Sequence, residues 1–200
     1  MIGIAGGSAC GKTTFARHLR KSAGEGHVTI LELDRFYLPS SQRTSSHAAN
    51  FDRPEALDLD LVESVVSELQ QRGESNVPVY DFASHDRVGF EHIDASPVII
   101  VEGILALWHA PLRRVLDSSF FVDTPHDDRL ARRIERDGRE RGRTPMSVRQ
   151  QWFETVLPMH LQFVEPTKAY ADHIVDGRDD LCRVAAIAVE QWKPWGSRQP

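Results

Sequence analysis

The sequence predicts an α/β fold of three layers, in which helices cover both faces of a central parallel sheet. Short apolar runs typical of buried strands alternate with amphipathic stretches of helical period along most of the chain. A glycine-rich loop of the form GxxxxGKT follows the first apolar run, where a strand gives way to a helix. The 200 residues, 40% of them hydrophobic, suffice for one well-buried domain and would be cramped as two, so residues 1–200 are expected to form a single domain.

The glycine-rich loop is expected at Gly6–Thr13, between a strand at Met1–Ala5 and a helix at Thr14–Arg20. Glycine permits positive φ and lets the backbone approach a ligand, and the N–H groups of such a loop and helix N-terminus bind phosphate. Lys12 can neutralise the β and γ phosphates of ATP, and the Thr13 hydroxyl can ligate Mg²⁺. This pattern predicts a P-loop NTPase fold. The residues expected around the phosphates are Gly6, Gly7, Ser8, Ala9, Cys10, Gly11, Lys12, Thr13 and Thr14.

A second buried strand is expected at Val28–Leu33. It delivers Asp34 at its carboxyl end, which in an open parallel sheet is the edge where ligands bind. The polar stretch Leu38–Ala49 lacks periodicity and is expected to form a mobile surface loop beside that edge.

The next elements are a helix and a projecting β-hairpin. Apolar residues from Leu61 to Leu69 keep a helical rhythm, Asp58 or Asp60 can cap this helix, and Gly73 ends it. Residues 77–93 alternate apolar and polar side chains around a polar turn, which predicts the hairpin. The remaining elements expected are a strand at Pro97–Val101, a helical stretch through Trp108 to Leu116, a strand at Phe120–Val122, helical periodicity from Ser147 that Pro158 kinks or breaks, a strand at Ala171–Val175, and a closing helix at Leu181–Trp192 followed by a polar tail.

An arginine-rich lid is expected at residues 127–145. Seven arginines stand against five acids between Asp127 and Arg143, in a chain whose net charge is −5. On a helix the arginines at 129, 132, 133 and 136 share one broad face. Gly138 and Gly142 are expected to loosen the segment, as a mobile lid requires.

Three groups of residues carry candidate chemistry. Asp34 can accept a proton from an acceptor hydroxyl, although an aspartate there also fits a helix cap or a turn. Glu102, directly after a β-run, stands where P-loop enzymes place the acid that holds Mg²⁺, or simply marks the end of the strand. The lid arginines can stabilise a transferring phosphoryl group, whereas an arginine-rich helix seen alone is more often a solvated surface.

Aromatic residues near these acids can bind a nucleobase or pack in the core. Tyr80, Phe82 and His85 lie in the hairpin, and Tyr37 and Phe51 lie close to acids. Such rings can sandwich a base, and histidine or tyrosine can hydrogen-bond to its edge, but core packing is the commoner fate of each. Cys10 is expected to be a small filler of the loop.

Composition excludes several other classes. A net charge of −5 argues against general nucleic-acid binding, and the longest apolar stretches are far too short to span a bilayer. With a strand expected from Met1, a leader peptide is not expected. Two distant cysteines argue against a structural disulfide and favour a cytoplasmic location, and nine scattered histidines show no zinc-site spacing.

Taken together, the motifs resemble the uridine kinase (uridine/cytidine kinase) family of the phosphoribulokinase-like kinases. They follow the family's order over nearly the whole chain: GGSACGKTT, DRFY, NFDRPEALD, PVYDFASHDR, VIIVEGILAL, FVDT, RLARRIERD, ERGR and PTKAYAD. The resemblance implies phosphorylation of the 5′-hydroxyl of uridine, and of cytidine, by ATP with Mg²⁺ in pyrimidine salvage. It also implies a homo-oligomer, commonly a tetramer.

Roles carried over from the family fall on matching positions. Asp34 resembles the base, with Lys12, Arg136 and Arg141 as further catalytic residues, and Asp52 resembles the residue that grips the ribose hydroxyls. The residues that the resemblance places at the nucleoside are Asp34, Tyr37, Phe51, Asp52, Tyr80, Phe82, His85, Arg136, Arg141 and Gln151. Arg133 and Arg143 join the phosphate loop on the ATP side, and Thr13 and Glu102 form the metal site.

The chain departs from the family pattern at a few positions. Cys10 stands where serine is usual, Arg35 replaces a small polar residue, Trp152 follows Gln151 where tyrosine is common, and the loop after Tyr37 is shorter than in many members. The alternatives are a related kinase acting on nicotinamide riboside, pantothenate or ribulose 5-phosphate, and a nucleotide-binding regulatory module without an acceptor. The hairpin aromatics favour a pyrimidine acceptor, and no NKxD, DxxG or LSGGQ-like pattern is present.

Overall fold

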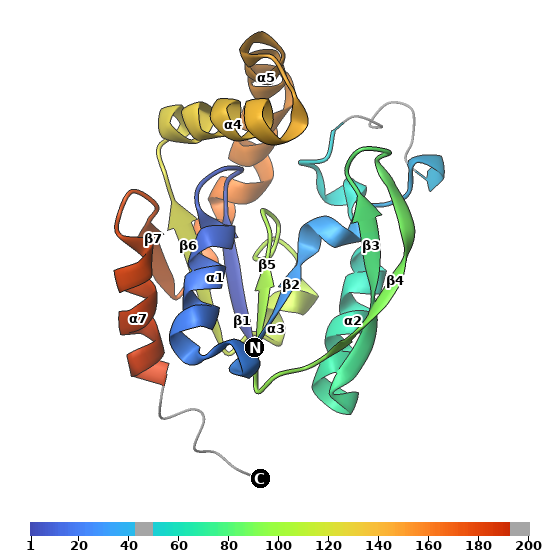
Figure 1. The fold of residues 1–200 in the computed structure, drawn as a ribbon, viewed down its shortest axis with the longest axis vertical. Coiled ribbons are helices and arrows are strands. Elements are labelled where there is room, and N and C mark those ends of the chain that lie inside the picture. The colour runs from blue at the N-terminus through green and yellow to red at the C-terminus, as the bar shows by residue number, and fades with distance from the viewer. Residues whose placement is uncertain (43–49, 193–200) are drawn as a thin grey trace.

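A computed structural model describes residues 1–42 and 50–192, and five strands in these ranges form one parallel sheet (Figure 1). The order across the sheet is β2-β5-β1-β6-β7, and every neighbouring pair is parallel. The strands are β1 (Ile2–Gly6), β2 (Val28–Glu32), β5 (Val98–Glu102), β6 (Ser118–Asp123) and β7 (His173–Asp176). They confirm the predicted strands to within a few residues. Because all of them run the same way, their carboxyl ends meet at one edge.

Two hydrophobic layers, one on each face of the sheet, make the three-layer architecture. On one face, α1 (Lys12–Ala23) and α7 (Leu181–Trp192) pack with the strands through residues such as Phe15 and Ala185. On the other face, α2 (Leu59–Arg72) packs through residues such as Val62. Neighbouring residues of β5 point to opposite layers, since Ile100 belongs to the first and Val101 to the second.

The helix boundaries follow their caps. Helix α1 begins at Lys12, directly after Gly11 at φ +106°, and so takes in the last two residues assigned by sequence to the loop. Asp58 caps α2, because its side chain accepts a hydrogen bond from the Leu61 N–H at 3.1 Å; the alternative, Asp60, lies inside the helix. Gly73, in the left-handed conformation, ends α2 as predicted.

The predicted hairpin forms a separate two-stranded antiparallel sheet of β3 (Glu74–Asp81) and β4 (Asp86–Asp94). It extends beyond residues 77–93 at both ends. A register shift between Val79 and Tyr80 bends it. Figure 1 shows the hairpin standing beside α2, with its turn directed to the same side as the carboxyl edge of the sheet.

Two predicted irregularities of helices, the loosening at Gly138 and Gly142 and the kink or break at Pro158, are found only in part. The lid helix α4 (His126–Arg141) runs through Gly138, and only Gly142, left-handed at φ +62°, ends it. A helical run from α5 (Pro145–Gln151) through α6 (Leu157–Met159) reaches Tyr170 without a break at Pro158. Two π-helical turns flank α6, and their wider turns accommodate a residue that lacks an N–H donor.

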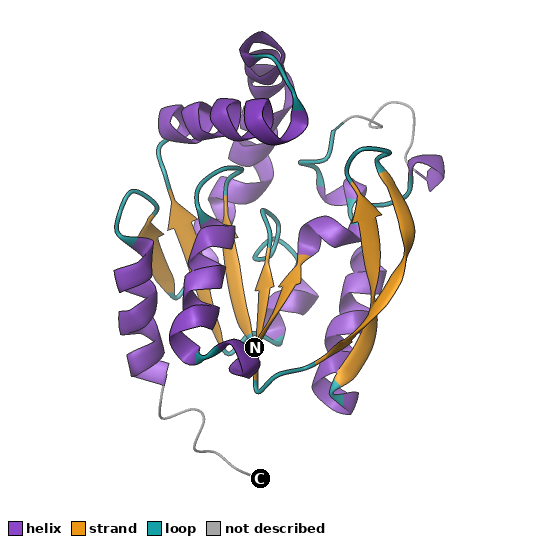
Figure 2. Ribbon diagram, viewed as in Figure 1, coloured by secondary structure: helices purple, strands orange, loops and turns teal. Residues whose placement is uncertain are grey.

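A third prediction was partly wrong, and others fall outside the described ranges. The expected helix through Trp108 to Leu116 is limited to α3 (Ala110–Arg114), preceded by turns. The predicted loop Leu38–Ala49 is described only as far as residue 42, and the predicted tail after Trp192 lies outside the described residues. Within residues 1–42 and 50–192, no helix combines the length and apolarity needed to cross a bilayer. Figure 2 shows α4 and α5 standing over the edge to which the sheet's strands point.

Candidate active site

The phosphate loop packs closely against β6 and α4 on one side and lines a cavity on the other. Gly6 and Gly11 have φ of +142° and +106°, and Ala9, at +62°, takes the left-handed conformation without being glycine. A Cβ at Gly6 would lie 2.5 Å from the Val122 carbonyl oxygen, and one at Gly7 would lie 2.0 Å from Nη1 of Arg129. The glycines are therefore needed both for backbone conformation and for contact with the elements that support the loop.

Lys12, Thr13 and Glu102 bring the loop and the end of β5 together. The Thr13 hydroxyl donates to Oε1 of Glu102 at 2.7 Å, while Oε2 of Glu102 is buried with no hydrogen-bond partner among the described residues. Burial raises the pKa of Glu102, against the opposing charge of Lys12. Burial disfavours the charged form of Lys12, but Glu102 and Asp34 outweigh it and raise the pKa of its ammonium.

This arrangement fits a divalent cation. Hydroxyl and carboxylate oxygens are the ligands that Mg²⁺ prefers, and an unsatisfied buried carboxylate oxygen is costly without a cation or another partner. Thr13 and Glu102 are the residues that would hold it. Cys10, whose pKa is raised by burial, remains a thiol within the loop and packs among apolar residues as expected of a filler.

The acid at the end of β2 lies within a short 3-10 turn, Leu33–Phe36. The Tyr37 hydroxyl donates to Oδ1 of Asp34 over 3.4 Å. Burial and the adjacent Asp34 carboxylate hold the pKa of Tyr37 well above its ordinary value, so Tyr37 remains a neutral donor. This long contact places the Tyr37 hydroxyl beside the Asp34 carboxylate at the carboxyl edge of the sheet.

Asp52 is a second acid on this side and, unlike Asp34, it is buried, with 8% of its surface exposed. Burial raises the pKa of Asp52, and Arg133 acts in the opposite direction. Its backbone N–H donates to Oδ1 of Asn50, which holds the turn after the undescribed residues 43–49. A carboxylate kept in such surroundings has free energy to gain from a ligand that donates hydrogen bonds to it.

The hairpin turn supplies the aromatic wall. His85 takes the left-handed conformation, φ +54°, and its ring lies 5.0 Å from that of Phe51. Tyr80 lies behind this wall: it is 8% exposed, and its ring contacts those of Tyr37 at 5.5 Å and Phe82 at 5.3 Å. A left-handed conformation at a non-glycine residue costs free energy, and such residues cluster in binding and active sites.

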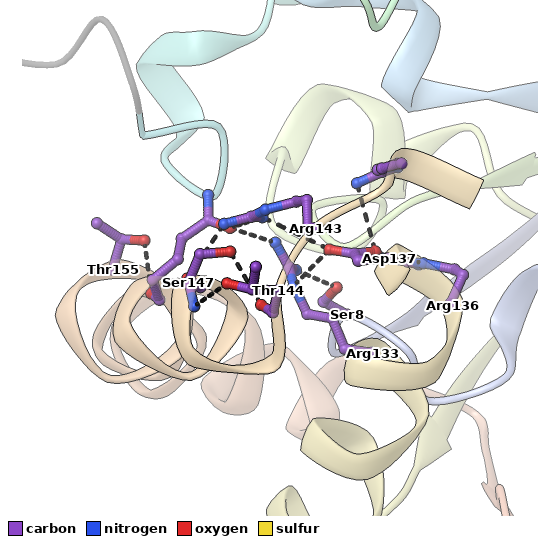
Figure 3. Close-up of polar contacts among 10 residues, drawn as sticks. Ser8, Arg133, Arg136, Asp137, Arg143, Thr144, Ser147 and Thr155 are labelled. Carbon is purple, nitrogen blue, oxygen red and sulfur yellow. Dashed lines mark hydrogen bonds and ion pairs between the residues drawn. The ribbon is translucent and has the colours of Figure 1, made fainter. Parts of the chain in front are cut away.

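The lid arginines complete the wall opposite the hairpin. Nη1 of Arg133 donates to the Ser8 hydroxyl at 2.6 Å, and Nη2 donates to Oε1 of Gln151 at 3.1 Å (Figure 3). Arg143 donates to the same oxygen of Gln151. The guanidinium of Arg141 lies 5.7 Å from the centre of the Phe82 ring, so the lid and the hairpin meet.

The four arginines predicted to share one face of α4 form two pairs, one that contacts the phosphate loop and one that lines the cavity. Arg129 is buried against Gly7 and lies 5.2 Å from the Trp152 ring, and Arg132 donates to the carbonyls of Cys10 and Gly177. These two support the loop from outside the cavity, whereas Arg133 and Arg136 line it.

One cavity of about 1060 Å³ connects the loop, the acids, the hairpin and the lid. Its lining residues are Ser8, Lys12, Asp34, Tyr37, Phe51, Asp52, Phe82, Ala83, His85, Ile104, Arg133, Arg136, Glu140, Arg141, Arg143 and Gln151. All residues assigned by sequence to the nucleoside line it except Tyr80. Sequence reasoning missed Ile104, Ala83 and Glu140, although each lies inside one of the motifs VIIVEGILAL, PVYDFASHDR and ERGR.

Known proteins similar to this chain are kinases. The sequence profile described as the Phosphoribulokinase / Uridine kinase family matches residues 1–181. Uridine kinase of Chloroflexus aggregans is 44% identical over 180 residues, which are 88% of this chain and 86% of that protein. Uridine kinase of Lactobacillus helveticus is 41% identical over 190 residues, which are 90% and 89% of the two chains.

Solved structures share the fold at lower sequence identity. Phosphoribulokinase from Rhodobacter spheroides aligns with a TM-score of 0.63 and 19% identity, over 90% of this chain and 72% of that one. D-glycerate 3-kinase from Cryptococcus neoformans var. grubii aligns with a TM-score of 0.62 and 17% identity, over 84% and 79% of the two chains. These similarities establish a P-loop kinase fold with a central parallel sheet.

Proposed function

Because the chain belongs to the phosphoribulokinase / uridine kinase family, we propose that it phosphorylates the 5′-hydroxyl of uridine, and of cytidine, with ATP as donor. The products are ADP and the nucleoside monophosphate. The single observation that carries the proposal is that Lys12, at the phosphate loop, and Asp34 line the same cavity as the aromatic turn of the hairpin. The cavity therefore offers neighbouring positions for the phosphate of the donor, for Asp34 as the catalytic base and for the acceptor nucleoside.

The proposed reaction begins at the acceptor hydroxyl. Asp34 accepts the 5′-hydroxyl proton as that oxygen attacks the γ-phosphorus, and the bond from phosphorus to the β–γ bridging oxygen breaks. The Tyr37 hydroxyl, held to Oδ1 of Asp34, orients the carboxylate. Without such orientation, the base would sample positions from which proton transfer is slow.

Cationic side chains of the loop and the lid are assigned to stabilise the negative charge of the phosphoryl group during transfer. Lys12 remains protonated and stands at the loop, and Arg136 and Arg141 line the cavity from the lid. A Mg²⁺ ion held by Thr13 and Glu102 would supply further positive charge to the triphosphate. Arg133, bonded to Ser8, and Arg143 are assigned to the ATP side.

Recognition of the nucleoside is assigned to the opposite wall. Asp52 is assigned to the ribose hydroxyls, which would donate hydrogen bonds to its buried carboxylate. Phe82, Phe51 and His85 are assigned to the pyrimidine, with rings for stacking and an imidazole for hydrogen bonding to the base edge. Tyr80 is assigned the support of Tyr37 and Phe82, since it lies behind them.

Further parts of the proposal concern the setting of the enzyme. We place it in the cytoplasm, in pyrimidine salvage, and as a homo-oligomer of the kind that the family resemblance implies. These assignments rest on the family and on the two distant cysteines.

Acceptor-dependent ADP release, measured against a panel of acceptors, tests the proposed function. The panel holds uridine, cytidine, a purine nucleoside, nicotinamide riboside, pantothenate and ribulose 5-phosphate. Turnover with uridine or cytidine is expected, and Asp34→Asn should lower kcat by about two orders of magnitude or more. Asp60→Asn, which changes an exposed acid of α2 that does not line the cavity, is the matched control and should retain activity. No turnover with either pyrimidine nucleoside would contradict the proposal.

A further inference from the structure

Asp137 is a wholly buried acid at the centre of the lid, and its carboxylate is shared by four arginines. Arg136 donates to Oδ1 through Nε at 2.9 Å and Nη2 at 2.8 Å. Arg133, Arg141 and Arg143 place guanidinium nitrogens 3.5, 3.6 and 3.6 Å from its oxygens. Figure 3 shows the carboxylate of Asp137 lying between Arg136 on one side and Arg143 on the other.

All four of these arginines line the cavity, whereas Asp137 itself is 0% exposed and does not. The arginines belong to different segments: Arg133, Arg136 and Arg141 lie on α4, and Arg143 follows its end. Four guanidinium groups packed this closely repel one another. One buried carboxylate attracts all of them: it is hydrogen-bonded to Arg136 and within ion-pair distance of the other three, while its Oδ2 accepts no hydrogen bond from the described residues. Arg133 and Arg143 are held at Gln151 as well.

The turn that ends α4 does not depend on the side chain of Asp137. The end of α4 is closed by main-chain bonds, since the N–H groups of Gly142 and Arg143 donate to the carbonyl oxygen of Asp137. Any residue at this position would offer that carbonyl. A buried carboxylate is costly unless its partners compensate it, so its contacts with the arginines are what explains an acid here.

We propose that Asp137 is the positioning residue of the arginine lid, which aims Arg136 and Arg141 at the phosphoryl group and Arg133 and Arg143 at the donor. Asp137 touches neither substrate. It acts through the guanidinium groups, and the proposal rests on the proposed kinase function. Its charge opposes the binding of a polyanion, so its benefit lies in orientation and not in attraction.

Replacing Asp137 should change kcat strongly and the KM for ATP little. Asparagine at position 137 keeps the size of the side chain and one acceptor oxygen, but loses the charge that gathers four cations. Asp137→Asn should lower kcat with uridine by about tenfold or more, because the cations no longer converge on the developing charge. The KM for ATP should rise by less than about twofold, because the lid becomes more positive by one charge. A residue that served only to stabilise the fold would not produce this division.

The experiment compares Asp137→Asn with Glu135→Gln, which removes the same charge from an exposed position on the same helix. Steady-state kinetics, thermal unfolding and ATP affinity by calorimetry are measured on each full-length variant and on the wild type. The control should match the wild type in all three. Calorimetry needs no acceptor, so a wild type that binds ATP but turns over no acceptor would refute the proposed function, whereas an active wild type beside an Asp137→Asn variant of equal kcat would refute the positioning role alone.

Several outcomes would overturn the proposal. An Asp137→Asn variant with wild-type kcat would do so, and so would a loss confined to the KM for ATP. If that variant does not fold, Asp137→Glu retains the charge but displaces the carboxylate, and the same fall in kcat without a rise in the KM for ATP is expected of it. Loss of fold in both variants would show that Asp137 acts on stability alone, which also overturns the proposal.

Discussion

The hydroxyl of Thr13 donates to Oε1 of Glu102 across 2.7 Å, joining two residues that lie 89 positions apart in the sequence. The contact links the first turn of α1 to the last residue of β5. It leaves the buried Oε2 of Glu102 for a cation. We expect Glu102→Gln to lower kcat by about a hundredfold and to raise the Mg²⁺ concentration needed for half-maximal activity.

Glu32 provides the control for this prediction, because it pairs in register with Glu102 on the neighbouring strand but does not line the cavity. Glu32→Gln should leave the Mg²⁺ dependence near that of the wild type. The measurement is a magnesium titration of ADP release at saturating ATP and uridine. Equal effects of the two substitutions would contradict the assignment of Glu102.

Asp52 should lower the stability of the free protein while serving substrate binding. Burial raises its pKa, so folding favours the neutral form and the ionised form at pH 7 destabilises the native state. Asp52→Asn should therefore raise Tm at pH 7, and the difference should vanish as the pH falls below the ordinary carboxyl range. The same variant should raise the KM for uridine by about tenfold to a hundredfold, through a lost charge-assisted hydrogen bond. Thermal unfolding against pH and uridine kinetics check both parts, and a Tm below that of the wild type at pH 7 would refute the first.

His160 should make the free energy of unfolding fall as the pH is lowered from 6.5 toward 4. Burial and the neighbouring Arg129 lower its pKa from 6.5 to about 4. A histidine that is harder to protonate in the folded state stabilises it fully above pH 6.5, and that stability is lost as the pH falls toward 4. The loss is on the order of 3 kcal/mol. His160→Gln should flatten the free energy of unfolding across this window, as measured by urea denaturation, whereas the exposed His126→Gln should not.

Arg87 should affect the binding of the acceptor and leave the binding of the donor almost unchanged. It donates from the hairpin to the carbonyls of Tyr37 at 2.9 Å and Phe36 at 3.0 Å, and to Asp58 at 2.9 Å. Lysine cannot supply these three directed donors. Arg87→Lys should raise the KM for uridine by about tenfold and leave the KM for ATP within about twofold. Arg72→Lys, exposed at the end of α2, is the matched control; equal rises in both KM values for Arg87→Lys would contradict the prediction.

Much of the fold and the candidate site could be predicted because the signals were local. Asp34 and Glu102 each lie at the end of a buried apolar run, and parallel strands end at one edge of the sheet, so the sequence could place both acids at that edge. That β2 and β5 are neighbours is known from the structure. The phosphate loop is likewise a continuous pattern. Helix α7 and the hairpin followed from periodicity alone.

The rest depended on contacts that no periodicity encodes. Tyr80 is buried against Tyr37 and Phe82, and it lies at a register shift in which Val88 of β4 is left unpaired. The buried state of Asp137 depends on the packing of α4 against the segment that follows it, and in the sequence this acid among arginines resembles a surface ion pair. Pro158 predicted a kink or a break, but the chain stays helical through it, between two π-helical segments that the periodicity of the sequence does not reveal.

The hairpin shares no backbone ladder with the central sheet within the described part of the chain, and Arg35 and Arg87 fasten it to the turn that carries Asp34. Arg35 donates to the Pro78 carbonyl at 2.8 Å and pairs with Glu91 at 2.7 Å. The consequence is mechanical: the turn of the hairpin is positioned over the cavity by two arginine side chains and not by strand pairing with the sheet, so the place of Phe82 and His85 depends on side-chain contacts alone.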